Sequence, residues 1–275
     1  MRNAENMTAE VRQEIGALLT RLFIQLRRRP ATLVAGILQP LMWLLLFGAL
    51  FQYAPAGLFG EQQSYLQFLT AGIIVFTAFS GALNAGLPMM FDREFGFLNR
   101  VLVAPLVSRF SVVLASAIFI ASLTLLQTVA VVATSAWLGA GLPSGSGLVL
   151  LVVVVTLLVL GFTMLSLGLA FALPGHQELL ALIFLVNLPL IFSSTALSPL
   201  AFMPEWLRWV ASLNPLSFAI EPIRYVYSHP SWSWDSVVML APWGEVTILG
   251  GTVVLLGFAG LVAVSIQGIL RRGIA

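Results

Sequence analysis

The sequence predicts an all-α polytopic membrane protein, in which an amphipathic surface helix precedes six transmembrane helices and short re-entrant helices precede the last span. Three observations predict this class. Of the 275 residues, 59% are hydrophobic and only 9% are charged, against roughly 25% charged in an ordinary soluble domain. The mean hydropathy is +1.00. Long charge-free segments recur, without the alternation over about ten residues that is typical of membrane β-strands. So few polar side chains cannot cover a water-facing surface, which excludes a soluble globular enzyme.

Two residue types are missing, and their absence excludes several kinds of chemistry. There is no cysteine, so the chain has no disulfide, no thiol nucleophile and no thiolate metal site. All 13 basic residues are arginine, and a phosphate-loop ATPase needs a lysine on the terminal phosphates. His176 and His229 lie too far apart for a zinc-binding helix motif. We therefore expect no catalytic residue, no metal site and no enzyme activity in this chain by itself.

Residues 1–30 are predicted to form an amphipathic helix on the membrane surface. Apolar residues recur there at helical spacing, with the charged residues elsewhere around the helix. Arg27, Arg28 and Arg29 follow at the level of the lipid headgroups. One interpretation is a helix that also meets a cytoplasmic partner, and the simpler one is an interfacial anchor. The apolar face consists of Val11, Ile15, Leu18, Leu19, Leu22, Phe23 and Leu26.

Charge-free gaps define the six spans, which together make residues 1–275 a single transmembrane domain. A helix needs about 20 apolar residues to cross a bilayer, and backbone groups in hydrocarbon must be satisfied within the helix. The longest gap is divided by the glycines and prolines of residues 139–147. The predicted spans are residues 33–53, 65–90, 111–138, 148–173, 179–200 and 246–270.

The arginines predict the orientation. Eleven of the 13 lie in the N-terminal segment, in the loop after the second span or in the C-terminal tail, and only Arg208 and Arg224 lie on the other side. The excess of arginine in cytoplasmic loops of membrane proteins therefore places both termini in the cytoplasm. A bacterial-type inner (plasma) membrane is the expected location.

The external segment of residues 201–245 contains five of the seven tryptophans, and indole rings favour the boundary between water and lipid. We expect two short helices that dip partway into the outer leaflet. Glu221 and Arg224 are three residues apart on the second of them and can pair. Together with Trp206 and Trp209, they are candidates for an external gate. The alternative is an interfacial cap that holds the spans in register.

The predicted cytoplasmic loop of residues 91–109 mixes charged and large apolar side chains. Phe95, Leu98 and Leu102 alternate with Glu94 and Asn99, which suggests a short helix docked against a partner. A merely solvated loop would not need this pattern.

Three stretches resemble the type-2 ABC exporter permeases, especially the permease subunits of daunorubicin-resistance-type drug exporters. They are REFGFLNRVLVAPLVSR at residues 93–109, PLAFMPEWLRWVASLNP at 199–215 and LNPLSFAIEPIR at 213–224. The resemblance covers essentially the whole chain, in the same order of helix, spans, loop and signature. It implies a dimer, with a second copy or a sister permease, and a separate nucleotide-binding ATPase subunit that holds ATP and magnesium.

The resemblance also implies which residues couple the permease to its ATPase. The family's coupling helix maps by position to residues 94–100, where the candidates are Glu94, Phe95, Phe97, Leu98 and Arg100. The surface helix would support the same contact. The missing lysine agrees with this division of labour, because ATP chemistry must then lie in another chain.

The family resemblance places the substrate path along the second and fifth spans. Asn84 and Asn187 are amides within those spans, and Gln127 lies in the third. Amides at membrane depth face protein or a cavity, so helix packing through hydrogen bonds is the alternative. The path candidates are Phe76, Phe79, Asn84, Phe184, Asn187 and Phe192.

The expected function is therefore that of a permease subunit for a hydrophobic or amphipathic cargo, such as a drug, lipid, glycolipid or polysaccharide. A secondary transporter is one rival, although no Asp, Glu or Arg falls in the middle of a span, where ion coupling would need it. An intramembrane lipid-modifying enzyme is the other, but no catalytic motif supports it. The expected partners are the ATPase, a second permease and the bilayer, with no nucleic acid.

Overall fold

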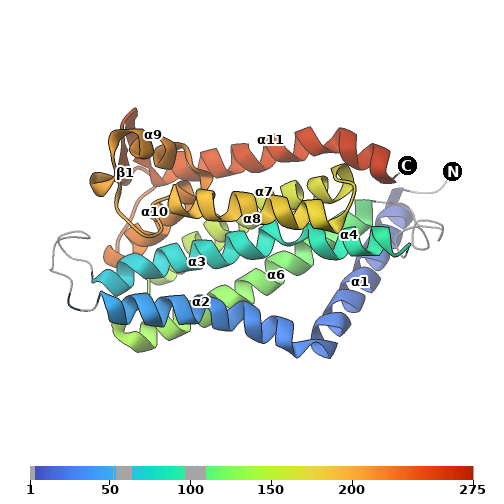
Figure 1. Cartoon of the computed structure of the whole chain (residues 1–275), viewed down its shortest axis with the longest axis horizontal. Coiled ribbons are helices and arrows are strands. Elements are labelled where there is room, and N and C mark those ends of the chain that lie inside the picture. The colour runs from blue at the N-terminus through green and yellow to red at the C-terminus, as the bar shows by residue number, and fades with distance from the viewer. Residues whose placement is uncertain (1–3, 52, 54–63, 97–109, 275) are drawn as a thin grey trace.

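The computed structural model describes residues 4–51, 53, 64–96 and 110–274, which form a bundle of long helices capped at one end by short elements (Figure 1). The start of α1 and the end of α11 lie at the same end of the bundle, which we call the arginine-rich end. The helices are α1 (Ala4–Arg28), α2 (Pro30–Leu50), α3 (Tyr65–Leu83), α4 (Gly86–Glu94), α6 (Phe110–Ser135), α7 (Gly145–Ala172), α8 (His176–Phe192), α9 (Glu205–Leu213), α10 (Pro215–Ser228) and α11 (Ile248–Ile274).

The chain is an all-α polytopic membrane protein. Within the described residues, five helical segments are long and apolar enough to cross a membrane: Leu33–Leu50, Tyr65–Glu94, Ser111–Ala140, Gly145–Ala172 and Ile248–Ile269. The apolar helix α8 has 17 residues, about 25 Å at 1.5 Å per residue, which is shorter than the hydrocarbon core of about 30 Å. α6 continues into a π-helical turn at Ala136–Ala140, where Gly139 has a φ of 99°.

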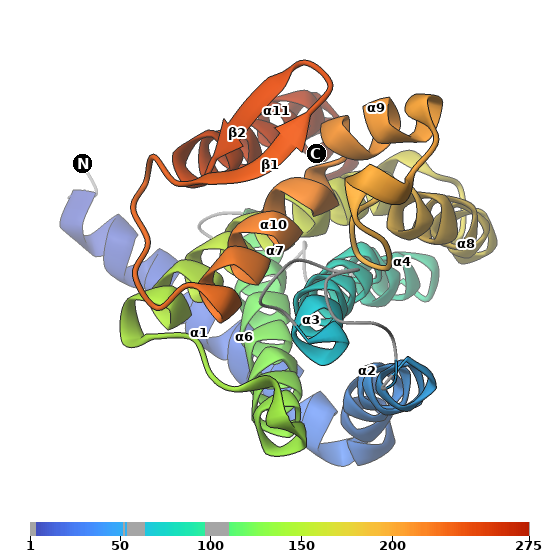
Figure 2. The ribbon, with the colours of Figure 1, turned by 90° about the vertical axis from the view of Figure 1, so that its left-hand side faces the viewer.

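Helix α3 is the centre of the fold. It packs against α2, α6, α7, α8 and α10, and Figure 2, which looks along the bundle, shows α2 and α8 at the periphery with α3 and α4 between them. α7 and α11 pack against each other over much of their length. A Cβ on Gly161 would approach the ring of Phe258 to 2.7 Å, and one on Gly168 would approach Ile266 to 2.5 Å. Small residues thus let these two spans approach, as is usual in membranes.

The second span is broken rather than continuous over residues 65–90. α3 ends at Leu83, α4 begins at Gly86, and α4 continues to Glu94, beyond the predicted end. Ser166 of α7 hydrogen-bonds to both sides of the break: its Oγ donates to the carbonyl of Leu83 and accepts from the backbone N–H of Gly86. A neighbouring helix thus satisfies the backbone groups that the break leaves free, as hydrocarbon requires.

Helix α8 ends earlier than the predicted span of residues 179–200. After Phe192 the chain turns, and only a short 3-10 helix follows at Leu200–Phe202. The amide of Asn214 donates to the carbonyls of Leu190 and Ser193 at 2.7 and 3.0 Å. This distant side chain satisfies carbonyls at the end of α8, which a helix leaves without partners.

The external segment contains the two expected short helices, α9 and α10. It also contains a β-hairpin that was not predicted from the sequence. β1 (Val237–Ala241) pairs antiparallel with β2 (Gly244–Thr247), beside α9 in Figure 2. Pro242 suits the first turn position, and Gly244 has a φ of 146°, which glycine adopts without strain. The last span consequently starts at Ile248 instead of residue 246.

Candidate functional site

Glu94 is bound within the chain. Its Oε1 accepts a hydrogen bond from the backbone N–H of His176 at 2.6 Å, and its Oε2 lies 2.6 Å from Nδ1 of the same residue. A carboxylate at this position caps the N-terminus of α8, where N–H groups lack partners and the helix dipole is positive. Both oxygens of Glu94 therefore hold α8 within this chain, and its expected contact with the ATPase stays a prediction.

Phe95 is the more exposed of the two coupling candidates that the structure describes, and Glu94 is exposed as well. The side chain of Phe95 is 78% exposed and stacks against Phe91 with 6.1 Å between ring centroids. The other three candidates, Phe97, Leu98 and Arg100, lie outside the described residues. With the neighbouring exposed Phe91, Phe95 forms an aromatic pair at the end of α4, and grouped exposed apolar side chains are typical of interaction sites.

The path candidates on α8 lie on the outside of this chain. Phe184 and Phe192 are 73% and 59% exposed, and Asn187 between them is partly exposed. Asn84 is also exposed, at the break after α3, and its Nδ2 donates to the carbonyl of Ser80 at 2.7 Å. The structure therefore leaves these four side chains on the surface of the chain rather than around a channel within it.

The two phenylalanines on α3 differ from each other. Phe76 is partly buried and lies 6.2 Å from Trp43 of α2, ring centre to ring centre. Phe79 is completely buried and packs edge-on against Phe162 of α7 at 4.7 Å. Its burial places Phe79 in the core of the chain, because α3 has protein on nearly all sides. The place of Phe79 on the substrate path stays a prediction.

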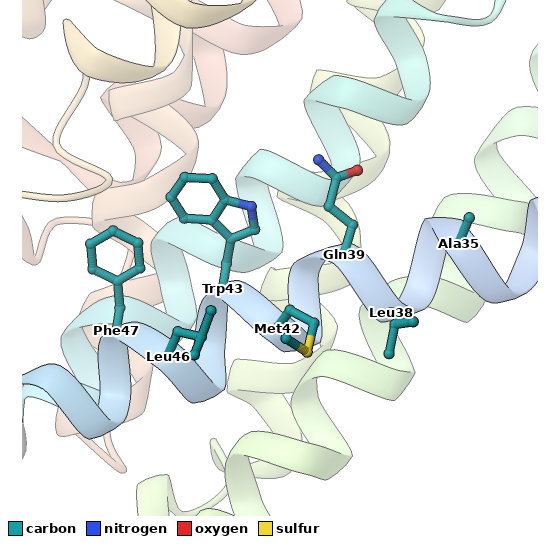
Figure 3. A pocket seen from close by; sticks show the side chains of 7 residues that line it. All are labelled: Ala35, Leu38, Gln39, Met42, Trp43, Leu46 and Phe47. Atoms are coloured by element: carbon teal, nitrogen blue, oxygen red, sulfur yellow. The ribbon is translucent and has the colours of Figure 1, made fainter.

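A groove on α2 was not predicted from the sequence. It has a volume of about 550 Å³, and Figure 3 shows Gln39, Trp43 and Phe47 projecting from the same side of the helix. Trp43 and Phe47 stack in parallel, 5.2 Å apart. The helical spacing of the lining could have revealed this face, which consists of Ala35, Leu38, Gln39, Met42, Trp43, Leu46 and Phe47.

The predicted pair of Glu221 and Arg224 forms, and it is buried. The two side chains are ion-paired and only 13% and 7% exposed. The guanidinium also donates to the carbonyl of Thr195 at 2.6 Å and lies 3.7 Å above the ring of Phe68 on α3. The pair therefore joins α10 to α3 and to the turn after α8.

The other two external candidates, Trp206 and Trp209 on α9, are 68% and 43% exposed. Their exposure contrasts with the burial of the Glu221–Arg224 pair. Trp243 of the hairpin turn donates its indole N–H to Ser212 of α9 at 3.2 Å, which fastens the hairpin to that helix. Over residues 4–51, 53, 64–96 and 110–274, no three His, Asp or Glu side chains gather as metal ligands.

Comparison with known proteins decides the family. The sequence profile of the ABC-2 type transporter family matches residues 13–227, from the surface helix to the end of α10. The chain belongs to the ABC-2 type transporter family. This membership makes it a transmembrane transport permease and implies an ATPase partner subunit.

The relatives agree with this assignment. The chain is 55% identical over 263 residues to the transport permease ycf38 of Porphyra purpurea, covering 95% of this chain and 90% of the relative. It is 52% identical over 246 residues to ycf38 of Cyanophora paradoxa, covering 90% and 85%. The daunorubicin resistance ABC transporter permease protein DrrB1 of Streptomyces coeruleorubidus is 26% identical over 239 residues, covering 82% and 80%.

Proposed function

We propose that this chain is the membrane-spanning subunit of an ATP-driven exporter and that it couples to a separate ATPase at the arginine-rich end. The observation that carries the proposal is the end of α4. There the exposed Phe95 follows three charged residues, each of which is tied to another helix of the bundle. ATP and magnesium belong to the partner in this proposal, because a chain without lysine lacks the phosphate-binding loop.

The cargo that fits is hydrophobic or amphipathic. The groove on α2 is lined by apolar and aromatic side chains with one amide, Gln39. Binding sites for such molecules are mostly apolar, with a few polar groups that fix orientation. A drug, lipid, glycolipid or polysaccharide carried on a lipid would meet these requirements, and the relative DrrB1 is named for daunorubicin resistance.

We place the path between two permeases, either two copies or this chain and a sister. Helices α2 and α8 each carry large apolar side chains with exposures from 41% to 73%, among them Leu46, Phe184 and Leu188. The polar side chains Gln39, Asn84 and Asn187 lie on the same helices or on the break between α3 and α4. A seam between two such surfaces would supply two polar stripes, whereas one protomer supplies only one.

The orientation in this proposal has both termini in the cytoplasm of a bacterial-type inner (plasma) membrane. Eleven of 13 arginines lie at the expected cytoplasmic end. Cytoplasmic loops of membrane proteins carry an excess of arginine and lysine, so this end is assigned to the cytoplasm. Trp206, Trp209, Trp234 and Trp243 then lie on the external side, at or near the membrane interface.

The proposal is tested by reconstituting the chain in liposomes with a phosphate-loop ATPase encoded beside it. We expect the two to co-purify and to move an amphipathic dye across the membrane only with hydrolysable ATP. The matched control is the same complex with the ATPase inactivated at its catalytic carboxylate. Equal dye movement by the chain alone without ATP would instead indicate a secondary transporter, and chemically altered lipid would indicate an enzyme.

A further inference from the structure

Three consecutive charged residues end α4, and each contacts a different element of the bundle. The first, Asp92, accepts hydrogen bonds from Nη2 of Arg21 on α1, at 3.2 and 3.0 Å to its two carboxylate oxygens. Both side chains are about 30% exposed. This contact fastens the surface helix to the end of the second span, although 71 residues separate the partners.

The second residue, Arg93, caps α7. Its Nη1 donates to the carbonyls of Ala170 and Phe171 at 2.8 and 3.2 Å, and its Nη2 donates to those of Leu173 and Pro174. The last carbonyls of a helix lack partners, and a cation is favoured at that end. A guanidinium with its planar fork of donors suits four carbonyls, whereas an ammonium group does not.

The third residue, Glu94, caps α8 through His176, as described above. The turn between α7 and α8 is therefore held on both sides by adjacent residues of α4. Arg93 satisfies the helix that enters the turn, and Glu94 satisfies the helix that leaves it. A Cβ on Gly175, in the turn itself, would lie 2.8 Å from Oε1 of Glu94, so α4 and this turn are in close contact.

We infer that Asp92, Arg93 and Glu94 join α1, α4 and the α7–α8 turn into one rigid unit, which carries movement of the end of α4 directly to α8. The inference rests on the proposed function, because the moving force is that of the ATPase. It makes Arg93, Glu94 and His176 positioning residues for transport, rather than residues that touch the ATPase or the cargo. α8 is the helix that carries Phe184, Asn187 and Phe192, so displacement of its N-terminus would reach the proposed path.

The first measurement is cargo moved per ATP hydrolysed by the reconstituted complex. We expect Glu94→Gln and Arg93→Gln to lower this ratio at least tenfold, while assembly with the ATPase and the rate of ATP hydrolysis stay within about twofold of wild type. Glu178→Gln is the matched control, because Glu178 is an exposed acid in the first turn of the same helix. An unchanged ratio in both Glu94→Gln and Arg93→Gln would overturn the inference.

Reversing the Arg21–Asp92 pair separates positioning from a general loss of stability. Arg21→Asp and Asp92→Arg should each lower the ratio, and the double variant should restore most of it, because the contact is then remade with opposite charges. Failure of the double variant to regain any coupling, with the protein folded and assembled, would remove Asp92 from the unit.

The second measurement uses this chain alone and does not depend on the ATPase. Nitroxides at Gln13→Cys on α1 and Gln177→Cys on α8 report the distance across the unit, since both side chains are exposed and the chain has no cysteine. We expect one narrow distance distribution that broadens in Arg93→Gln and not in Glu178→Gln. A broad distance distribution in the spin-labelled chain with Arg93 intact would overturn the rigid unit. A narrow distribution together with no ATP-driven transport would overturn only the proposed function.

Discussion

Ser166 of α7 and Gly86 of α4 are joined by a hydrogen bond of 2.9 Å from the glycine N–H to the serine Oγ, at the point where the second span breaks. The same Oγ donates to the carbonyl of Leu83 on the other side of the break. A Cβ on Gly86 would come within 2.4 Å of the Ser166 carbonyl oxygen. The helices therefore approach closely here, and the break presents the neighbouring Asn84 to the outside.

Ser166→Ala should destabilise the protein by about 1–3 kcal/mol, because a buried N–H and a buried carbonyl lose their partner. Thermal unfolding in detergent measures the effect. Ser265→Ala is the control, since Ser265 is exposed on α11 and bonds only to its own helix at Leu261. Equal melting temperatures for the two variants would show that the break does not depend on Ser166.

Gly72→Ala should also destabilise, by about 1–3 kcal/mol, because added volume in a packed core forces the backbone apart. A Cβ on Gly72 would collide with the backbone carbonyl of Ala196, in the turn after α8. Gly257→Ala on α11 meets open space and gains helix propensity of about 1 kcal/mol. The two variants should therefore shift the melting temperature in opposite directions, and a stabilised Gly72→Ala would contradict the close contact.

Glu221→Gln should cost about 3–5 kcal/mol, because it leaves the buried guanidinium of Arg224 without its counter-charge. Glu205→Gln, which removes an exposed carboxylate at the start of α9, should change stability by less than about 0.5 kcal/mol. Denaturation of both variants in the same detergent provides the comparison. If both variants lose equally little stability, the contacts of Arg224 with Thr195 and Phe68 are sufficient to stabilise its buried charge.

Asn187→Leu should change cargo selectivity more than stability, since its side chain lies partly exposed between Phe184 and Phe192. The measurement is transport of several cargos together with the melting temperature of the same variant. If Asn187 instead serves helix packing, the protein will be less stable and the surviving molecules will keep the wild-type cargo profile. Leu185→Ala, on the same helix and 71% exposed, controls for a general change of this surface.

The predicted orientation can be tested with single cysteines in this cysteine-free chain. Gln13→Cys on α1 and Ser231→Cys in the external segment are both at exposed positions. An impermeant thiol reagent added to intact cells should label Ser231→Cys, and it should label Gln13→Cys only after lysis. Labelling of Gln13→Cys from outside would reverse the topology drawn from the arginines.

The sequence by itself determined the fold class, five of the long helices to within a few residues, and the two short external helices. Hydrophobic length decides the spans, because a charge-free run of about 20 apolar residues suits a helix that crosses the bilayer. The tryptophans of residues 201–245 indicated the external helices, because indole rings favour the membrane interface. The spacing of Glu221 and Arg224 likewise predicted their ion pair, since residues three apart on a helix are neighbours.

Only the tertiary structure decided where the second and fifth spans break or end, and which way the charged residues point. The break after Leu83 depends on Ser166, and the end of α8 depends on Asn214; both partners are distant in sequence. Phe76 and Phe79 differ in burial because α7 covers one of them, which no local pattern encodes. Glu94 likewise has the character of a docking residue, yet its carboxylate caps α8, because the fold brings an uncapped helix N-terminus within 2.6 Å of it.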